Sequence, residues 1–203
     1  MTPKHWAFIF LTSVTMSAAA QQQPQGYTRV NRTLSAVTGF VHMNELPGDG
    51  VAWINGKTWT GGTLECDIRG KDAFQQSFVG IAFHGANDST FEVVYLRPFN
   101  FRSADTLRKK HAIQYIALPR FDWDTLRRTF PGKFEQPVTP APDPNDWVHL
   151  KIIVKGKRIE AFVNGATKAA LVVTSLAEMR GTKVGFWVGN GSGGDFKNLK
   201  LLY

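Results

Sequence analysis

Cysteine is nearly missing from this chain of 203 residues, which contains a single one, Cys66. One cysteine forms no disulfide within the chain, so a hydrophobic core must hold the fold together. Cys66 occupies an apolar position in the alternating segment 63–69. This predicts a small buried side chain rather than a nucleophile or a metal ligand. The sequence also has no His/Cys cluster to build a zinc site, so we assign no metal ligand and no cofactor, and the binding of an ion such as calcium stays open.

Long apolar runs are missing as well. Residues 1–20 have a short polar start with Lys4 and His5, then an apolar stretch at 6–11, and they end in three alanines. The apolar stretch is too short to span a bilayer, and the small residues fit a signal-peptidase site. We therefore predict a cleaved signal peptide over 1–20 and a periplasmic or secreted protein without a membrane span. Residues 21–38 then form a leader and first edge segment, followed by one domain over 39–203.

Negative charge is in short supply. The sequence has 24 Lys and Arg against 16 Asp and Glu, a formal net charge of +8, and losing Lys4 with the signal peptide leaves +7 (+8 − 1). The basic residues are scattered, apart from the runs at 108–110 and 127–128, and form no nucleic-acid motif. We expect no nucleic-acid partner. An acidic polysaccharide or a phosphate-rich surface fits better, and a plain solvated basic face remains the alternative.

Strand patterns dominate the sequence after residue 29, with polar and apolar residues alternating in short segments. The dipeptides Asn55-Gly56 and Asn164-Gly165 predict hairpin turns. Together these signals predict an all-β fold, an antiparallel two-sheet sandwich. The residues predicted to face its core are Leu64, Cys66, Ile68, Val79, Ile81, Phe83, Val148, Leu150, Ile152, Val154, Ile159, Ala161 and Val163.

One long segment, residues 102–146, departs from this pattern. It contains six of the ten prolines, so much of it is unsuited to a central strand. Asp122 is placed to cap a short helix over 123–130. Because its aromatic residues argue against disorder, we predict an ordered insertion packed over one face of the sandwich.

Several segments resemble the concanavalin A-like lectin/glucanase superfamily. They are GTLECDI (62–68), FVGIAF (78–83), WVHLKI (147–152), FVNG (162–165), GFW (185–187) and FKNLK (196–200). The chain looks like an exported bacterial branch that includes the 3-keto-disaccharide hydrolase-like domains of unknown function. The resemblance implies a jelly roll whose concave sheet handles carbohydrate.

The glucanases of that superfamily carry a strand with Glu-x-Asp followed by a further Glu. Here Glu65-Cys66-Asp67 begins in the same way, but Ile68-Arg69-Gly70 follow and no second Glu arrives. A retaining mechanism needs two carboxyl groups roughly 5 Å apart. The glucanase pair is therefore incomplete, and whether the protein is an enzyme stays open.

Candidate catalytic residues are His84, Arg97 and Glu135. His84 is expected on the face opposite Ile81 and Phe83, as a general base or a hydrogen-bond donor to a sugar. Arg97 offers a fork of donors to a carboxylate or to vicinal hydroxyls, or else pairs with Glu92 or Glu135. Glu135 is a candidate acid or base. The candidate ligand-binding residues are Glu92, Asn100, Gln114, Tyr115 and Trp123.

Gln114 and Tyr115 are neighbours on a strand and must point to opposite faces, so only one of them can reach a given site. Trp53 and Trp123 are candidate stacking platforms for a sugar ring, with core packing as the alternative. We expect the ligand between the sheet face that carries His84 and Arg97 and the 102–146 insertion.

Three function classes follow. The first is an exported monomeric protein that binds carbohydrate without catalysis. The second is a glycoside hydrolase or lyase acting on ordinary or 3-keto-glycosides. The third is a structural accessory domain without a ligand.

Overall fold

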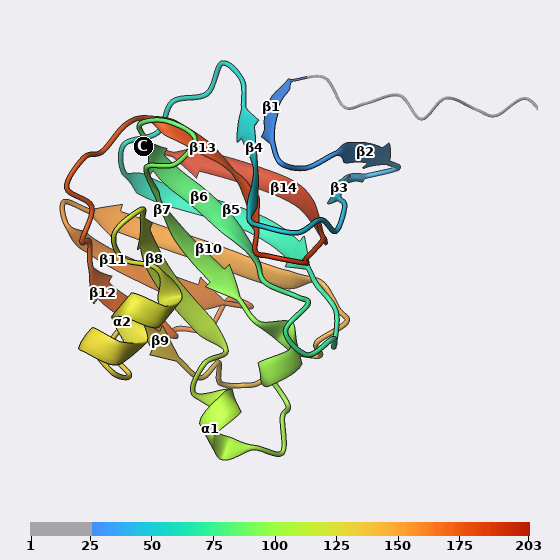
Figure 1. The fold of residues 1–203 in the computed structure, drawn as a ribbon, viewed down its shortest axis with the longest axis vertical. Coiled ribbons are helices and arrows are strands. Elements are labelled where there is room, and N and C mark those ends of the chain that lie inside the picture. Colours follow the sequence, from blue (N-terminus) through green and yellow to red (C-terminus); the bar gives the residue numbers. More distant parts are fainter. Residues whose placement is uncertain (1–25) are drawn as a thin grey trace, which may run out of the picture.

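The computed structural model describes residues 26–203, and the predicted signal peptide lies outside them. Two antiparallel sheets of seven strands pack face to face, which confirms the predicted all-β sandwich. In Figure 1, strands β6, β7 and β8 cross in front of the strands of the second sheet. Within residues 26–203, no helix is both long and apolar enough to cross a membrane.

The first sheet, called sheet A here, carries the helical elements at one end. Its strands in spatial order are β1 (Tyr27–Val30), β4 (Gly50–Ile54), β13 (Lys183–Val188), β6 (Val79–Gly85), β7 (Phe91–Leu96), β8 (Ile113–Leu118) and β9 (Glu135–Gln136).

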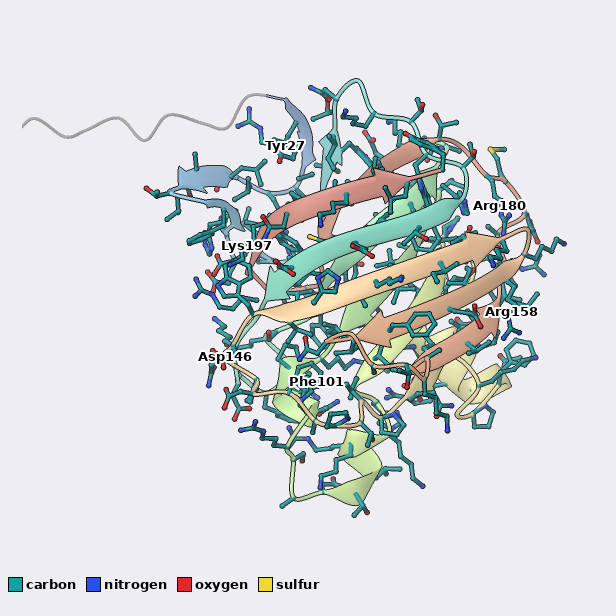
Figure 2. The ribbon with its side chains drawn as sticks, turned by 180° about the vertical axis from the view of Figure 1, so that it is seen from behind. Tyr27, Phe101, Asp146, Arg158, Arg180 and Lys197 are labelled. Atoms are coloured by element: carbon teal, nitrogen blue, oxygen red, sulfur yellow. The ribbon has the colours of Figure 1, made fainter. Side chains whose placement is uncertain are left out.

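The second sheet, sheet B, faces the viewer in Figure 2, where Arg158 and Lys197 lie on or beside it. Its strands in spatial order are β12 (Leu171–Thr174), β11 (Arg158–Val163), β10 (Val148–Lys155), β5 (Gly62–Arg69), β14 (Gly194–Leu202), β3 (Phe40–Met43) and β2 (Leu34–Val37). The predicted leader and edge segment thus contributes β1 and β2, one edge strand to each sheet.

The core lies between the sheets. Phe186 of β13 stacks on Phe196 of β14 with ring centroids 4.6 Å apart, which joins the inner faces of the two sheets. Every residue predicted for the core face is buried, from Leu64 in β5 to Val163 in β11. The period-2 alternation of these strands is the cause, because it sends one side chain in two toward the partner sheet.

A row of residues crosses the outer face of sheet A. Trp187 opposes Gly80, Gly80 opposes Tyr95, Tyr95 opposes Gln114, and Gln114 opposes Glu135. Residues opposed across neighbouring strands point to the same face. Glycine is required in this row, because a Cβ at Gly80 would lie 2.5 Å from the Cβ of Tyr95. Its absence lets the Tyr95 and Trp187 rings approach to 4.9 Å.

The segment 102–146 is ordered but does not lie wholly on one face. It supplies β8 and β9 to sheet A, since residues 113–118 contain no proline and pair fully with β7. Around these strands it forms α1 (Thr106–Lys109) and α2 (Trp123–Thr129), while η1 (Pro98–Asn100) precedes it. Figure 1 shows α2 beside β8 and α1 at the end of the molecule. Asp122 caps α2 as predicted, accepting from the Thr125 N–H at 2.8 Å.

One predicted hairpin is confirmed and the other is wrong. Asn164-Gly165 begins the connection between β11 and β12, which pair antiparallel. Asn55-Gly56 also turns the chain, with Gly56 at φ +70°, but the segment after the turn does not pair back onto β4, whose partners are β1 and β13. The chain instead crosses to sheet B and forms β5.

Candidate functional site

A cavity of about 820 Å³ is hollowed into the outer face of sheet A. Its floor comes from four strands of sheet A: Val51 (β4), Trp187 (β13), Phe91 and Tyr95 (β7), and Ile116 and Leu118 (β8). These side chains stand on the sheet face that points away from the core. The floor is therefore mostly aromatic and apolar, as in most small-molecule sites.

Loops, short helices and strand ends from several parts of the chain form the walls. The lining residues outside the floor are Val30, Asp49, Gly50, Phe74, Gln75, Phe78, Asp88, Ser89, Arg97, Phe99, Asn100, Arg108, His111, Pro119, Asp122, Trp123, Arg127, Gly189 and Asn190. Segment 102–146 supplies His111, Arg127 and Trp123 to this wall. Without it the sheet face would be open to solvent.

Arg97 directly follows strand β7 and lines the cavity, only 4% exposed. Its Nη1 donates to the His111 carbonyl at 3.2 Å and to Glu135 Oε2 at 3.4 Å. Its Nη2 donates to the Tyr95 hydroxyl at 2.8 Å, and that hydroxyl donates to Gln114 Oε1 at 3.0 Å. Arg97 thus pairs with Glu135, one of the two partners considered from the sequence, and links the sheet floor to the insertion.

Glu135 is buried beneath the cavity wall, where basic groups surround its carboxylate. Arg127 donates from Nε to Oε1 at 2.9 Å and from Nη2 to Oε2 at 2.7 Å, a two-pronged contact. His111 Nδ1 lies 2.8 Å from Oε2 without the alignment of a hydrogen bond. Burial alone would raise the pKa of Glu135, but Arg127, His111 and Arg97 outweigh it and hold the pKa below its usual value. An ionised, fully paired carboxylate suits a positioning role better than that of a general acid.

Asn100 connects Arg97 to a second arginine. Its Nδ2 donates to the same His111 carbonyl at 3.1 Å, and its Oδ1 accepts from Arg108 Nε at 3.2 Å. Arg108 Nη2 also donates to the Phe99 carbonyl at 2.9 Å, and its guanidinium carbon lies 4.3 Å from the centre of the Phe74 ring. The arginine-rich end of the cavity is therefore one connected network.

Trp123 is the first residue of α2 and one of the exposed aromatic side chains of the molecule, at 48%. It lines the cavity, and Arg127 lies 5.2 Å from its ring centre. Trp53 differs: it is 2% exposed, packs edge-on against Phe91 and donates from Nε1 to Asp88. Of the two candidate platforms, only Trp123 offers an open face in the cavity.

Three aspartates line the other parts of the cavity. Asp88 lies in the loop before β7, at the opposite end of that strand from Arg97, and contacts Lys183 Nζ at 3.1 Å. The protein packed around Asp49 raises the pKa of its carboxyl group although much of the residue faces solvent, and the charge of Asp122 adds to this. Asp49 and Asp122 are therefore close enough to interact.

His84, Glu92 and Tyr115 lie elsewhere, on the inner face of sheet A. His84 Nδ1 is 2.6 Å from Glu92 Oε2, and the Tyr115 hydroxyl donates to Glu92 Oε1 at 2.6 Å. His84 Nε2 contacts the Thr60 carbonyl at 3.1 Å, and the ring stacks on Trp59 at 5.6 Å. The expectation that His84 shares a face with Arg97 differs from the structure, since a φ of +51° turns its side chain inward.

The sheet therefore separates the candidate residues into two groups. Arg97, Asn100 and Trp123 line the cavity, while Gln114 and Glu135 support it from below. His84, Glu92 and Tyr115 form a buried cluster on the other face of the sheet. Gln114 and Tyr115 therefore point to opposite faces, as predicted.

Sequence reasoning missed several cavity residues. Trp187 and Tyr95 belong to strands whose apolar character predicts only packing, and Asp49 lies in a loop remote in sequence. The sequence shows Arg108 and Arg127 only as members of short basic runs, which does not predict that they line a cavity. The alternation of β7 would have placed Tyr95 and Arg97 on one face, and this was the one available signal.

The incomplete glucanase pair lies on the opposite side of the molecule. Asp67 accepts from Asn198 at 2.7 Å and contacts His149 Nδ1 at 2.7 Å, while Glu65 lies 3.8 Å from Lys151, all on the outer face of sheet B. Within residues 26–203, no three His, Cys, Asp or Glu residues are grouped to hold a metal ion.

No protein-family model and no curated protein sequence matches the chain. Solved structures do match in fold. The carbohydrate-binding module CBM66 from Bacillus subtilis has a TM-score of 0.62 at 17% identity, over 86% of this chain and 93% of that one. The exoplasmic/lumenal domain of VIP36, in a form bound to Ca²⁺ and Man3GlcNAc, has a TM-score of 0.58 at 10% identity, over 88% and 87%.

A third match is a Bacillus subtilis protein of unknown function with a galectin-like fold. It has a TM-score of 0.55 at 13% identity, over 85% of this chain and 87% of that one. These likenesses establish a lectin-like β-sandwich fold. No family model or curated sequence supports the finer resemblance to 3-keto-disaccharide hydrolase-like domains.

Proposed function

We propose that this protein binds carbohydrate in the cavity on the outer face of sheet A. The observation that carries the proposal is the composition of that cavity. An aromatic floor with Tyr95 and Trp187 and the open face of Trp123 stand beside a fixed network of polar donors. Aromatic faces cover the C–H surface of a sugar ring, and the polar groups select its hydroxyls.

The volume of the cavity suits a short glycan. About 820 Å³ lies within the range of small-molecule sites and leaves room for more than one sugar ring. Contacts within the protein hold the side chain of Arg97 in place, so little side-chain entropy is lost when a ligand binds.

Two proteins of the same fold support this proposal by what they are described as binding. CBM66 is a carbohydrate-binding module, and VIP36 is described in complex with Man3GlcNAc. Export with cleavage near Ala20, from the sequence, would place the site where extracellular glycans occur. Membership of the 3-keto-disaccharide hydrolase-like branch is part of the same proposal.

Glycoside turnover is a second candidate function, favoured by one observation. Asp49 and Asp122 both line the cavity and interact, and the pKa of Asp49 is raised. Glycoside hydrolysis uses two carboxyl groups that flank the bond to be cleaved, and this cavity offers such a pair. Turnover by the wild type that Asp49→Asn abolishes would support this pair, whereas turnover that survives the substitution, or none in the wild type, would exclude it.

A glycan array probed with the mature protein, followed by calorimetric titration of the strongest hit, tests the main proposal. Trp123→Ala should weaken binding by about tenfold, because it removes an aromatic face from the cavity wall. The melting temperature should change little, since the side chain is half exposed.

Tyr203→Ala is the matched control, because Tyr203 is an exposed aromatic residue outside the cavity. It should bind like the wild type. Equal affinity of the Trp123→Ala variant and the wild type would move the site away from this cavity, and an array without any hit would remove the proposed function.

A further inference from the structure

We infer that the cavity recognises an acidic glycan, with a sugar carboxylate seated at its arginine-rich end. This inference rests on the proposed function and adds the chemical class of the ligand. Arg97, Arg108 and Arg127 all line this end of the cavity.

The arginines at this end outnumber the carboxylates that contact them. Glu135 is the acid that Arg97 and Arg127 contact, with Oε2 at 3.4 Å and 2.7 Å from the two guanidinium groups. Arg108 bonds only neutral groups, the Asn100 side chain and the Phe99 carbonyl. The three guanidinium groups thus have direct contact with a single carboxylate, beside the ring of His111, and the charge of Asp124 also acts on Arg127.

Donors remain for a ligand. Arg127 uses Nε and Nη2 on Glu135, and Arg108 uses Nε and Nη2 on Asn100 and Phe99. Within residues 26–203, the Nη1 atoms of both arginines are left without a hydrogen-bond partner. A guanidinium edge facing a cavity pairs best with a planar carboxylate, as Arg127 already does with Glu135.

The acidic groups of the cavity have partners of their own. Asp88 precedes β7 whereas Arg97 follows it, and Asp49 precedes β4 at the edge of sheet A where β7 ends, with two strands between β4 and β7. Asp88 has Lys183 as its basic partner, and Arg32 acts on Asp49. Asp122 caps α2. The cavity therefore offers three arginines to an anion, and separate carboxylates that can accept from sugar hydroxyls.

A sulfate ester carries the same charge as a carboxylate, so the probes must distinguish the two. We would titrate the mature protein with oligomers of galacturonate, mannuronate and glucuronate. The matching methyl esters keep the sugar and remove the charge. Neutral gluco- and manno-oligosaccharides and a sulfated galactan oligomer complete the set.

At least one free uronate should bind, and its methyl ester should bind at least about tenfold more weakly. Arg108→Gln should weaken the uronate by about tenfold and the ester hardly at all. Affinity for the uronate should fall as salt rises. Arg158→Gln is the control, because Arg158 is exposed on sheet B and pairs with Glu160; it should leave affinity unchanged.

Binding of neutral glycans alone would overturn the acidic ligand and keep the proposed function. Binding of the sulfated oligomer without any uronate would overturn the carboxylate. Equal affinity for a uronate and its ester, or an Arg108→Gln variant that binds uronate like the wild type, would also overturn the inference. No binding to any probe, together with an empty glycan array, would remove the proposed function itself.

Discussion

Glu92 is the residue on which the buried polar cluster of sheet A depends. It is fully buried and takes a hydrogen bond from Tyr115 at one oxygen and contacts His84 at the other. Glu92→Gln removes the negative charge that faces His84 and Arg180, whose Nε lies 3.5 Å from Glu92 Oε2. We expect a loss of about 3 kcal/mol in the free energy of unfolding, which lowers the melting temperature by roughly 6–12 °C.

Thermal unfolding followed by circular dichroism measures this loss. Glu178→Gln is the matched control, because Glu178 is exposed and its ion pair with Arg120 is also exposed. Such a pair contributes less than about 1 kcal/mol. Equal melting temperatures for Glu92→Gln and Glu178→Gln would show that the cluster does not stabilise the fold.

Arg97 combines a structural and a binding position. Its two Nη atoms reach Tyr95, Glu135 and the His111 carbonyl at once, which a lysine ammonium cannot reproduce. Arg97→Lys should therefore lower the melting temperature and the glycan affinity together. A variant that keeps its melting temperature and loses only affinity would show that the contacts to Glu135 and Tyr95 carry no stability. Full stability with full affinity would place the ligand away from Arg97.

At the scale of elements, helix α2 forms part of the cavity wall, and a side-chain cap stabilises its first turn. Asp122 accepts from the Thr125 N–H, and losing such a cap costs about 1 kcal/mol. Asp122→Ala should lower stability by that amount and weaken glycan binding, because α2 carries Trp123 and Arg127 into the cavity. Asp122→Asn keeps a good capping residue and should restore the stability. Chemical denaturation of the two variants checks this, and equal stability of both would contradict the role of the cap.

The strands differ in how far their sequences predict them. The alternation in β10 and β11 predicts both the strands and their buried faces, because one side of each is solvated and the other is core. The sequence of β8 does not predict which face meets the core, because the strand lies in a proline-rich segment and is buried on both faces. The Asn55-Gly56 turn carries a hairpin signal, but local turn chemistry does not determine which sheet the next strand joins.

The site is less predictable than the strands for a related reason. A strand pattern places Gln114 and Tyr115 on opposite faces, yet His84 breaks such a pattern through one positive φ angle. The walls are made by residues far apart in sequence, such as Asp49 and Asn190, and only the packed fold brings them together. Arg97 is predictable as a site residue because a charged side chain there follows an apolar strand and precedes a proline.

For the whole molecule, buried carboxylates determine the behaviour in acid. Burial alone would raise the pKa values of Glu92 and Glu135, but hydrogen bonds and basic neighbours hold both below their usual values. Their folded-state pKa values are lower than the unfolded ones. They therefore contribute stability above about pH 4.3 that is lost as the pH falls through the folded-state values.

The melting temperature should thus change little between about pH 8 and pH 5 and fall steeply below about pH 4. In Glu135→Gln the acid-induced fall should be smaller, since one of the titrating groups is gone. A series of melting curves across this range decides the matter. A wild-type melting temperature that holds steady at low pH would contradict the stated directions of the two pKa shifts.

The central claim is that a sugar occupies the cavity on the outer face of sheet A. The indole N–H signals in a ¹H–¹⁵N spectrum test it most directly, because the tryptophans report on separate places. Trp123 and Trp187 line the cavity, Trp59 is buried in the core and Trp147 stands beside Lys197 of sheet B. Titration with the strongest array glycan should shift the signals of Trp123 and Trp187 and leave those of Trp59 and Trp147 in place. A shift of Trp147 with Trp123 and Trp187 unchanged would contradict the account.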